Sequence, residues 1–392
     1  MKIFYSILQE IKVIYFAIKT LSYNSCRSKH HYTDAAFEPI FWFVDHFTNY
    51  LGIIFVGAVI LLTASVVAFW YIFLRPVIDT YNTNWMFLHY IYAHWLLLNI
   101  VFNYFKAVFT DPGHPPQGKP MDKLQGAVVC KKCIQPKPPR THHCSICNRC
   151  VLKMDHHCPW MNNCIGFFNH RYFTLFCIYM WLGVVYVSWS CSDLFWYHFF
   201  HPGTLMDKAK QMTSLKFAFG LSPVFESFLK MVDETAEMGG GVEEINENYR
   251  PHPGGFQTVW EWEHVGIIYL FLLCSAVVIA LGALNCWHII LISRGETSIE
   301  VHINTSERKK AAKRGMGYNN QYHYGVLKNW KRLLGLHHQR SFLRILFPSS
   351  HLPYGDGCSW ETNGRAQHYP DAKARERFEH SKDRKKWCKC LC

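Results

Sequence analysis

The chain has 392 residues, of which 50% are hydrophobic, 16% are aromatic and only 18% are charged, and its formal net charge is +13. So low a share of charged residues is unusual for a soluble protein and favours an integral membrane protein. No basic stretch is interleaved with stacking aromatic residues. The positive charge therefore does not indicate a nucleic-acid binder, and membrane orientation with anionic lipid explains it better.

The first 50 residues begin with an apolar stretch that is interrupted by Gln9, Glu10, Lys12 and Lys19. A signal peptide requires an uninterrupted apolar core and small residues at a cleavage site. We therefore expect residues 1–50 to form a cytosolic segment with an amphipathic helix that lies on the membrane surface.

Four apolar runs are long enough to span a bilayer, for which about 20 helical residues are needed. These runs are residues 51–74, 85–105, 172–190 and 265–292. The second run is rich in aromatic residues and contains His89 and His94, for which packing or interfacial roles are expected. A buried helix of a soluble protein resembles one such run, but four of them predict transmembrane helices.

The charges between the runs predict the orientation in the membrane. Residues 106–171 carry ten Lys and Arg against three acids, and the region from Arg294 onward holds twenty of the 41 basic residues. Residues 192–262 instead carry five basic and ten acidic residues. By the positive-inside rule, both termini and residues 106–171 face the cytosol, while the long loop faces the lumen.

Residues 130–164 hold seven of the sixteen cysteines and four histidines. Cys130 with Cys133, and Cys144 with Cys147, form two C-x2-C pairs, which place two thiolates on one turn of a tetrahedral zinc site. Two Cys3His sites would use six cysteines and two histidines, so that one cysteine and two histidines stay free. Spacing alone does not say which cysteine is spare. A reducing cytosol suits zinc-bound and free thiols rather than disulfides.

The residues around Cys158 favour it as the spare thiol. In an extended stretch, alternate side chains share a face, so His156 and Cys158 can meet while His157 points to the other side, towards a metal. A cysteine with a pKa near about 8.5 needs a neighbouring base to become a nucleophile at neutral pH, and His156 can act as this base. Asp155 would orient the imidazole only if the backbone turns before it.

These residues resemble the cysteine-rich domain of the DHHC family of integral-membrane protein S-acyltransferases, with a dense match at residues 130–173. The resemblance implies two interleaved zinc sites, with His142 left unassigned. The first site would use Cys130, Cys133, His143 and Cys150. The second would use Cys144, Cys147, His157 and Cys164. It also implies that Cys158 is the acyl-accepting nucleophile, with His156 as its base and Asp155 as the orienting acid.

Three further motifs lie outside this domain. Residues 111–113 resemble the DPG motif of the family, although the same residues are an ordinary turn signal. Residues 297–300 stand where the family usually has Thr-Thr-x-Glu; Ser298 departs from this pattern but keeps a hydroxyl for a bond towards the catalytic segment. The alternative for this motif is a helix capping box. Tyr324, Gly325 and Asn329 resemble the C-terminal aromatic and Asn motif that braces the catalytic domain.

The sequence therefore predicts an α-helical integral membrane protein with four transmembrane helices and a cytosolic cysteine-rich domain of short β-hairpins that holds two zinc ions. The expected divisions are an N-terminal segment (1–50), helices 1 and 2 (51–105), the zinc domain (106–171), helix 3 (172–191), a luminal loop (192–264), helix 4 (265–292) and a cytosolic C-terminal region with a basic tail (293–392). In that tail, Cys388, Cys390 and Cys392 are either acylated anchors or unmodified thiols.

The expected function is protein S-palmitoyltransferase, with acyl-CoA as donor and cytosolic cysteines of membrane-associated proteins as acceptors. The acyl tail would lie among the four helices, where Gly183 leaves room for it or allows close helix packing. The candidate contacts for the CoA phosphates are Lys132, Lys137, Arg140, Lys153 and Arg171. The resemblance over the whole chain is strongest to a member that resides in the endoplasmic reticulum, with the Golgi as the alternative location.

Two other functions are compatible with a membrane protein that contains zinc. A non-enzymatic adaptor would use the zinc domain only as a binding surface, but it would not need a spare thiol beside a histidine. A metal or ion transporter is disfavoured because the apolar runs contain no Asp, Glu, Lys or Arg pathway.

Overall fold

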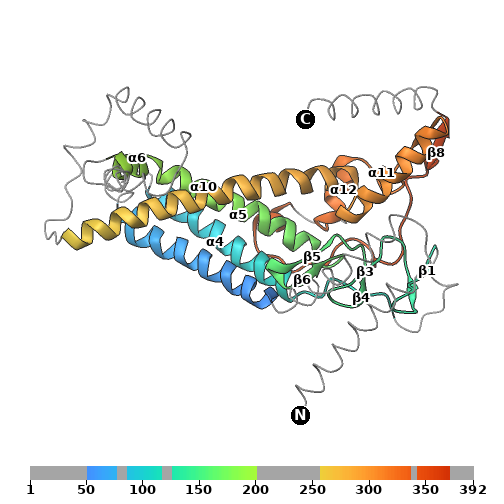
Figure 1. Ribbon diagram of the computed structural model, residues 1–392, viewed down its shortest axis with the longest axis horizontal. Coiled ribbons are helices and arrows are strands. Elements are labelled where there is room, and N and C mark those ends of the chain that lie inside the picture. The colour runs from blue at the N-terminus through green and yellow to red at the C-terminus, as the bar shows by residue number, and fades with distance from the viewer. Residues whose placement is uncertain (1–50, 77–85, 117–125, 201–256, 337–341, 371–392) are drawn as a thin grey trace, which may run out of the picture.

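The computed structural model describes residues 51–76, 86–116, 126–200, 257–336 and 342–370. Long helices lie side by side along the long axis of the molecule, and short strands gather at one end of them (Figure 1). The predicted N-terminal amphipathic helix, most of the predicted luminal loop and the three cysteines of the tail lie outside the described residues.

The long helices of the described chain are Leu51–Leu74, α4 (Met86–Phe109), α5 (His170–Ser190) and α10 (Gln257–Arg294). Three stretches, Leu51–Leu74, His170–Ser190 and Glu263–Arg294, are long and apolar enough to cross a membrane. The helical class and three of the predicted spans are thus supported. Helix α4 has 24 residues but is not among the three, because its Tyr, His, Asn and Trp side chains make it less apolar.

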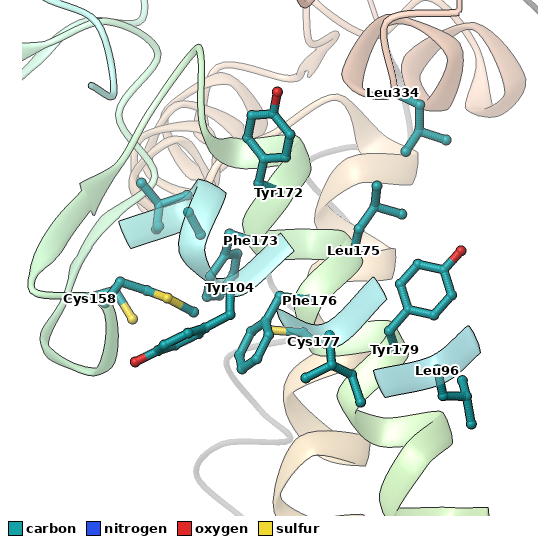
Figure 2. Close-up of a cluster of buried hydrophobic side chains, with 14 residues drawn as sticks. Leu96, Tyr104, Cys158, Tyr172, Phe173, Leu175, Phe176, Cys177, Tyr179 and Leu334 are labelled. Atoms are coloured by element: carbon teal, nitrogen blue, oxygen red, sulfur yellow. The ribbon is translucent and has the colours of Figure 1, made fainter. Parts of the chain in front are cut away.

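Helix α5 packs against both α4 and α10 and is the centre of the helical part. Its N-terminal half contributes most of the aromatic side chains of the main buried cluster, to which α4 adds Leu96 and Tyr104. Figure 2 shows Cys158 at the edge of this cluster, beside Tyr104 and Phe173. The first helix contains a π-helical turn, η1 (Trp70–Leu74), and α6 (Ser192–Phe200) packs on α10 by stacking Phe195 on Phe271 at 4.0 Å.

The cysteine-rich region consists of three antiparallel hairpins. They pair β1 (Val128–Val129) with β2 (Pro136–Lys137), β3 (His142–Cys144) with β4 (Arg149–Val151), and β5 (His156–Cys158) with β6 (Asn163–Ile165). A 3-10 turn, η3 (Pro159–Met161), connects the last two strands. The predicted short β-hairpins are therefore present.

The turn at residues 111–113 attaches the end of α4 to these hairpins. The Gly113 amide donates to Asp111 Oδ1 at 2.7 Å, which closes the turn, and the Gly113 carbonyl accepts from the Leu152 amide at 2.9 Å. Directly after β6, a Cβ on Gly166 would lie 2.8 Å from the Pro112 carbonyl oxygen and 3.0 Å from that of Leu152. Only glycine fits there without moving the backbone, so this crowded junction fixes β6 against α4.

The C-terminal part consists of α11 (Ser298–Lys313), α12 (Val326–Leu333), α13 (Leu343–Leu346) and the hairpin of β7 (Met316–Tyr318) with β8 (His368–Pro370). Helix α11 lies at the same end of the long helices as the cysteine-rich hairpins (Figure 1). Asn329 in α12 donates to the Ser293 carbonyl at 3.0 Å and accepts from the Tyr324 amide at 3.1 Å. The aromatic and Asn motif therefore braces the end of α10.

Candidate active site

The first group of metal-binding side chains joins a turn to a hairpin. Cys130 and Cys133 come from the turn between β1 and β2, whereas His143 and Cys150 are direct partners across β3 and β4. The His143 Nδ1 atom lies 3.1 Å from Cys133 Sγ and 3.9 Å from Cys130 Sγ, and the Cys133 and Cys150 sulfurs are 3.7 Å apart. These are the four residues that the resemblance implied for the first site.

The second group repeats this arrangement one hairpin later. Cys144 and Cys147 flank the turn between β3 and β4, and His157 pairs directly with Cys164 across β5 and β6. His157 Nδ1 lies 3.8, 3.4 and 3.5 Å from the sulfurs of Cys144, Cys147 and Cys164 respectively. The two groups are interleaved, because β3 supplies His143 to the first and Cys144 to the second.

Both groups fit a tetrahedral zinc ion. Within each group, the four donor atoms lie within 4.8 Å of one another, and a zinc ion with sulfur ligands at about 2.3 Å implies donor separations of about 3.8 Å. Neither His143 nor His157 has a hydrogen-bond partner at its buried Nε2 among the described residues, so each ring is turned with Nδ1 towards thiols alone. Three thiols with one imidazole form a donor set typical of structural zinc.

Strand β5 separates the remaining thiol from the metal ligands. His157 faces the second group, while His156 and Cys158, one residue to either side, face the helices. Cys158 belongs to neither group of four and is 5% exposed. The structure therefore places His156 and Cys158 on one face of the strand and His157 on the other, as the alternation in an extended stretch predicted.

Asp155 reaches His156 because the chain turns before the strand begins. Lys153 adopts a left-handed conformation with φ of 43°, and the Asp155 amide then donates to the Ile165 carbonyl at 2.9 Å. His156 Nδ1 lies 2.6 Å from Asp155 Oδ2. This contact requires the proton on Nδ1 and thus leaves Nε2 as the nitrogen that can accept a proton.

The electrostatics of the pair favour a charged imidazole. Partial burial lowers the pKa of His156, but hydrogen bonds to Asp155 and to the Cys158 thiol outweigh this and raise it to about 10. Burial raises the pKa of Asp155, but the hydrogen bond from His156 and nearby histidines outweigh that effect, and the pKa falls well below its usual range. The carboxyl group is therefore ionised and the histidine is a strong base.

Ser298, at the start of α11, holds the far side of the Asp155 carboxylate. Its amide donates to Oδ1 at 2.7 Å and its hydroxyl to Oδ2 at 3.0 Å. The neighbouring Thr297 and Glu300 close a capping box on the same turn. Residues 297–300 thus serve both alternatives considered for them, because the capped helix start presents Ser298 to Asp155, directly before β5.

A cavity of about 720 Å³ runs from Cys158 between the long helices. Along α5 its lining extends from Phe173 to Val187, an axial length of about 21 Å at 1.5 Å per residue. The lining includes His156 and Cys158 near the N-terminal part of α5, Trp70 of the first helix, and residues of α4 and α10. Gly183 lies in the wall, where a Cβ would meet Ile100 Cδ1 at 3.1 Å.

The five residues predicted to bind CoA phosphates occupy different surroundings. Arg140 pairs with Glu300 through two contacts of 2.6 Å, and Arg171 is 4% exposed and donates to the Ser349 carbonyl at 2.9 Å. Lys153 is half-buried near the Trp360 ring. Lys132 is exposed and Lys137 half-buried on the first hairpin, and the CoA contacts stay a prediction.

One buried residue beside the site was not anticipated. His288 of α10 is 5% exposed, and its Nδ1 atom lies 4.0 Å from Asp155 Oδ2. An ionisable side chain inside an apolar run is itself a signal of function in a membrane protein. That signal could have pointed to His288, which the sequence analysis did not name, but nothing local connects it to Asp155, 133 positions earlier.

Comparison with known proteins identifies the family. A model of the DHHC palmitoyltransferase family matches residues 123–305. The human protein named palmitoyltransferase ZDHHC16 is 46% identical over 347 residues, which cover 88% of this chain and 84% of the human protein. The chain belongs to the DHHC palmitoyltransferase family.

Other members of the DHHC palmitoyltransferase family show the same relationship. Palmitoyltransferase ZDHHC16B of Danio rerio is 43% identical over 348 residues, covering 88% of this chain and 86% of that protein. A probable protein S-acyltransferase 16 of Arabidopsis thaliana is 32% identical over 253 residues, covering 61% of this chain and 70% of that protein. The predicted family and its acyltransferase class are confirmed, as is the likeness to its Abl-philin member, ZDHHC16.

Proposed function

We propose that this chain is a protein S-palmitoyltransferase that carries the acyl group on Cys158 between acyl-CoA and cysteines of membrane-associated proteins. The position of Cys158 is the observation that carries the proposal. Its thiol is outside both metal-binding groups, shares strand β5 with His156, which is paired with Asp155, and lines the cavity between the helices. A non-enzymatic adaptor leaves this combination unexplained.

We assign α4 as the fourth transmembrane helix. It packs along α5 and lines the same cavity. Its polar Asn99 and Asn103 are buried, whereas its apolar Phe87, Leu88 and Leu98 are 70%, 52% and 55% exposed. Polar residues inside and apolar residues outside are the arrangement expected in lipid.

With four spans, both termini and the cysteine-rich hairpins lie on one side of the membrane. The basic residues of segments 106–171 and 293–392 favour the cytosolic side. Residues 192–264 then form the luminal loop, and the bilayer surrounds segments 51–105, 172–191 and 265–292. We propose the endoplasmic reticulum as the location, with the Golgi as the alternative.

Each metal-binding group would hold one zinc ion with all four ligands from the protein. The first group is Cys130, Cys133, His143 and Cys150, and the second is Cys144, Cys147, His157 and Cys164. Zinc in such closed sites supplies folding free energy, on the order of 10 kcal/mol, rather than an open position for the substrate.

In the first step, His156 Nε2 holds the proton taken from the Cys158 thiol, which gives the charged imidazole that the raised pKa of His156 favours. The thiolate attacks the carbonyl carbon of palmitoyl-CoA, a new C–S bond forms and the bond to the CoA sulfur breaks. The imidazolium returns the proton to the leaving CoA thiolate. Asp155 holds Nδ1 throughout and stabilises the charged imidazole.

In the second step, a cytosolic cysteine of the acceptor protein gives its thiol proton to His156. Its thiolate attacks the acyl–Cys158 thioester, and Cys158 leaves as a thiolate that regains the proton from the imidazolium. The acceptor must approach from the cytosolic surface, because helices enclose the acyl chain on the other side of Cys158.

The cavity explains how a soluble donor is held at the membrane. Burying the roughly 14 methylenes of a palmitoyl chain at about 0.8 kcal/mol each provides about 11 kcal/mol of apolar driving force at most. The cavity wall on α5 is deep enough for such a chain. The CoA phosphates stay in water, where the exposed Lys132 and the half-buried Lys137 of the first hairpin are the candidate contacts.

Labelling with an acyl-CoA tests the proposal. Purified protein incubated with radiolabelled palmitoyl-CoA should form a hydroxylamine-sensitive adduct, and Cys158→Ser should abolish it. Cys177→Ser is the matched control, because Cys177 is a second buried thiol in the wall of the same cavity and its loss should leave labelling intact. Full labelling of the Cys158→Ser variant, or none in the wild type, would refute the acyl-enzyme.

A further inference from the structure

His288 shares a ring cluster with the catalytic histidine. The His156 and Phe173 rings are 5.1 Å apart, those of Phe173 and His288 are 5.2 Å apart, and those of His156 and His288 are 5.8 Å apart. Phe173 meets both imidazoles edge to face, at 71° and 75°. Three rings at these distances restrict one another, so His288 limits how far His156 can rotate.

His288 also faces the carboxylate that orients His156. Asp155 Oδ2 accepts from His156 Nδ1 at 2.6 Å and from the Ser298 hydroxyl at 3.0 Å. His288 Nδ1 approaches the same oxygen to 4.0 Å and has no hydrogen-bond partner among the described residues. An unpaired polar nitrogen in a side chain that is 5% exposed is costly unless it gains a partner during function.

The side chains of Asp155, His156 and His288 are close enough to suggest a metal site. Their contacts instead favour a cluster that is held by hydrogen bonds. A separation of 2.6 Å between His156 Nδ1 and Asp155 Oδ2 is a hydrogen bond with a proton between the two atoms. A metal ion would need both atoms to point at it instead of at each other. Beyond His156 and Ser298, His288 Nδ1 is the donor that approaches the Asp155 carboxylate within 4.0 Å among the described residues.

We propose that His288 is a positioning residue, which donates from Nδ1 to the Asp155 carboxylate and keeps His156 aimed at Cys158 during acyl transfer. The inference rests on the proposed function. A shift of about 1 Å brings the 4.0 Å contact to hydrogen-bond length, and catalytic hydrogen bonds are often long before substrate binds. The carboxylate is then held from α11 by Ser298 and from α10 by His288, so it stays in place while His156 exchanges its proton.

Three substitutions separate hydrogen bonding from packing. His288→Asn keeps an N–H donor at the same number of bonds from the backbone as Nδ1, His288→Leu has nearly the shape of Asn but no donor, and His288→Phe keeps a ring but no donor. The measurement is the rate of Cys158 acylation at saturating palmitoyl-CoA, with its apparent KM and the zinc content of each variant.

We expect the Leu and Phe variants to acylate roughly tenfold more slowly than the wild type, with KM unchanged, and the Asn variant to stay within about threefold of it. If Phe is as fast as Asn, His288 acts by packing and the proposal is overturned; equal rates for Asn and Leu overturn it as well. If the Phe variant loses zinc, the comparison of acylation rates between the Asn and Leu variants alone tests the proposal. If wild-type protein is never acylated, the proposed function fails; a labelled wild type with unaffected variants refutes only the role of His288.

Discussion

The ion pair between Arg140 and Glu300 yields the sharpest prediction about how the cysteine-rich hairpins are held on the helices. Arg140 follows the first hairpin and Glu300 lies in α11, and their side chains are 4% and 10% exposed. Two contacts of 2.6 Å join them, and the guanidinium also lies 4.6 Å from the Trp360 ring. So little solvent reaches the pair that screening scarcely weakens it.

Neutralising one partner leaves the other charge buried, which typically costs about 3 to 5 kcal/mol. Glu300→Gln is the cleanest change, because Gln keeps the volume and the capping box with Thr297 while it removes the charge. Arg140→Met removes the other charge. Each single variant should be strongly destabilised, whereas the double variant should recover most of the loss, because an apolar or neutral replacement of a buried pair is often close to neutral.

The assay is thermal unfolding of the full chain in detergent, followed by labelling of newly exposed thiols, together with zinc content and the KM for palmitoyl-CoA. The two single variants and the double variant form a double-mutant cycle, which isolates the interaction free energy between Arg140 and Glu300. A double variant no more stable than the weaker single would refute the ion-pair reasoning. A stable Arg140→Met variant with a raised KM would instead make Arg140 a CoA contact.

Two further predictions concern the metal-binding groups and the cavity. Cys130→Ala should lose zinc and stability while Cys158→Ala keeps both, as measured by metal analysis and thermal unfolding; equal zinc loss in the two would show that the ligands are misassigned. Gly183→Phe should fill the cavity beside Ile100 and shift acylation from palmitoyl-CoA towards shorter chains in a competition assay, and an unchanged chain-length profile would place the acyl tail elsewhere.

The parts of the site that sequence predicted are those with local periodicity. Apolar runs of about 20 residues indicated the long helices, C-x2-C spacing indicated the turns, and alternation along residues 156–158 separated His157 from the two residues on either side. Each of these patterns lies within a short stretch of sequence, so it can be recognised without knowledge of contacts between distant segments. The two groups that could hold a metal ion contain the same residues that the family resemblance implied.

The parts that sequence did not predict depend on contacts between distant segments. The left-handed Lys153 turns Asp155 towards His156 although no glycine marks the position. His288 approaches the same carboxylate from a helix far along the chain. Arg171, a predicted CoA contact, is likewise joined to residues 349–351, which lie far along the chain. No local sequence pattern predicts these contacts, because they depend on how separate helices and strands pack against one another.

Strand β5 has a consequence for how this segment can vary in length. Its three residues alternate between the proposed base, a proposed metal ligand and the proposed nucleophile, and each is paired by register with one residue of β6. Shifting the register of this strand by one residue would turn His157 towards the helices, and His156 and Cys158 towards the thiols of the second group. Such a change would remove zinc binding and chemistry in a single event. We therefore expect this segment to tolerate substitutions at its edges but no change of spacing.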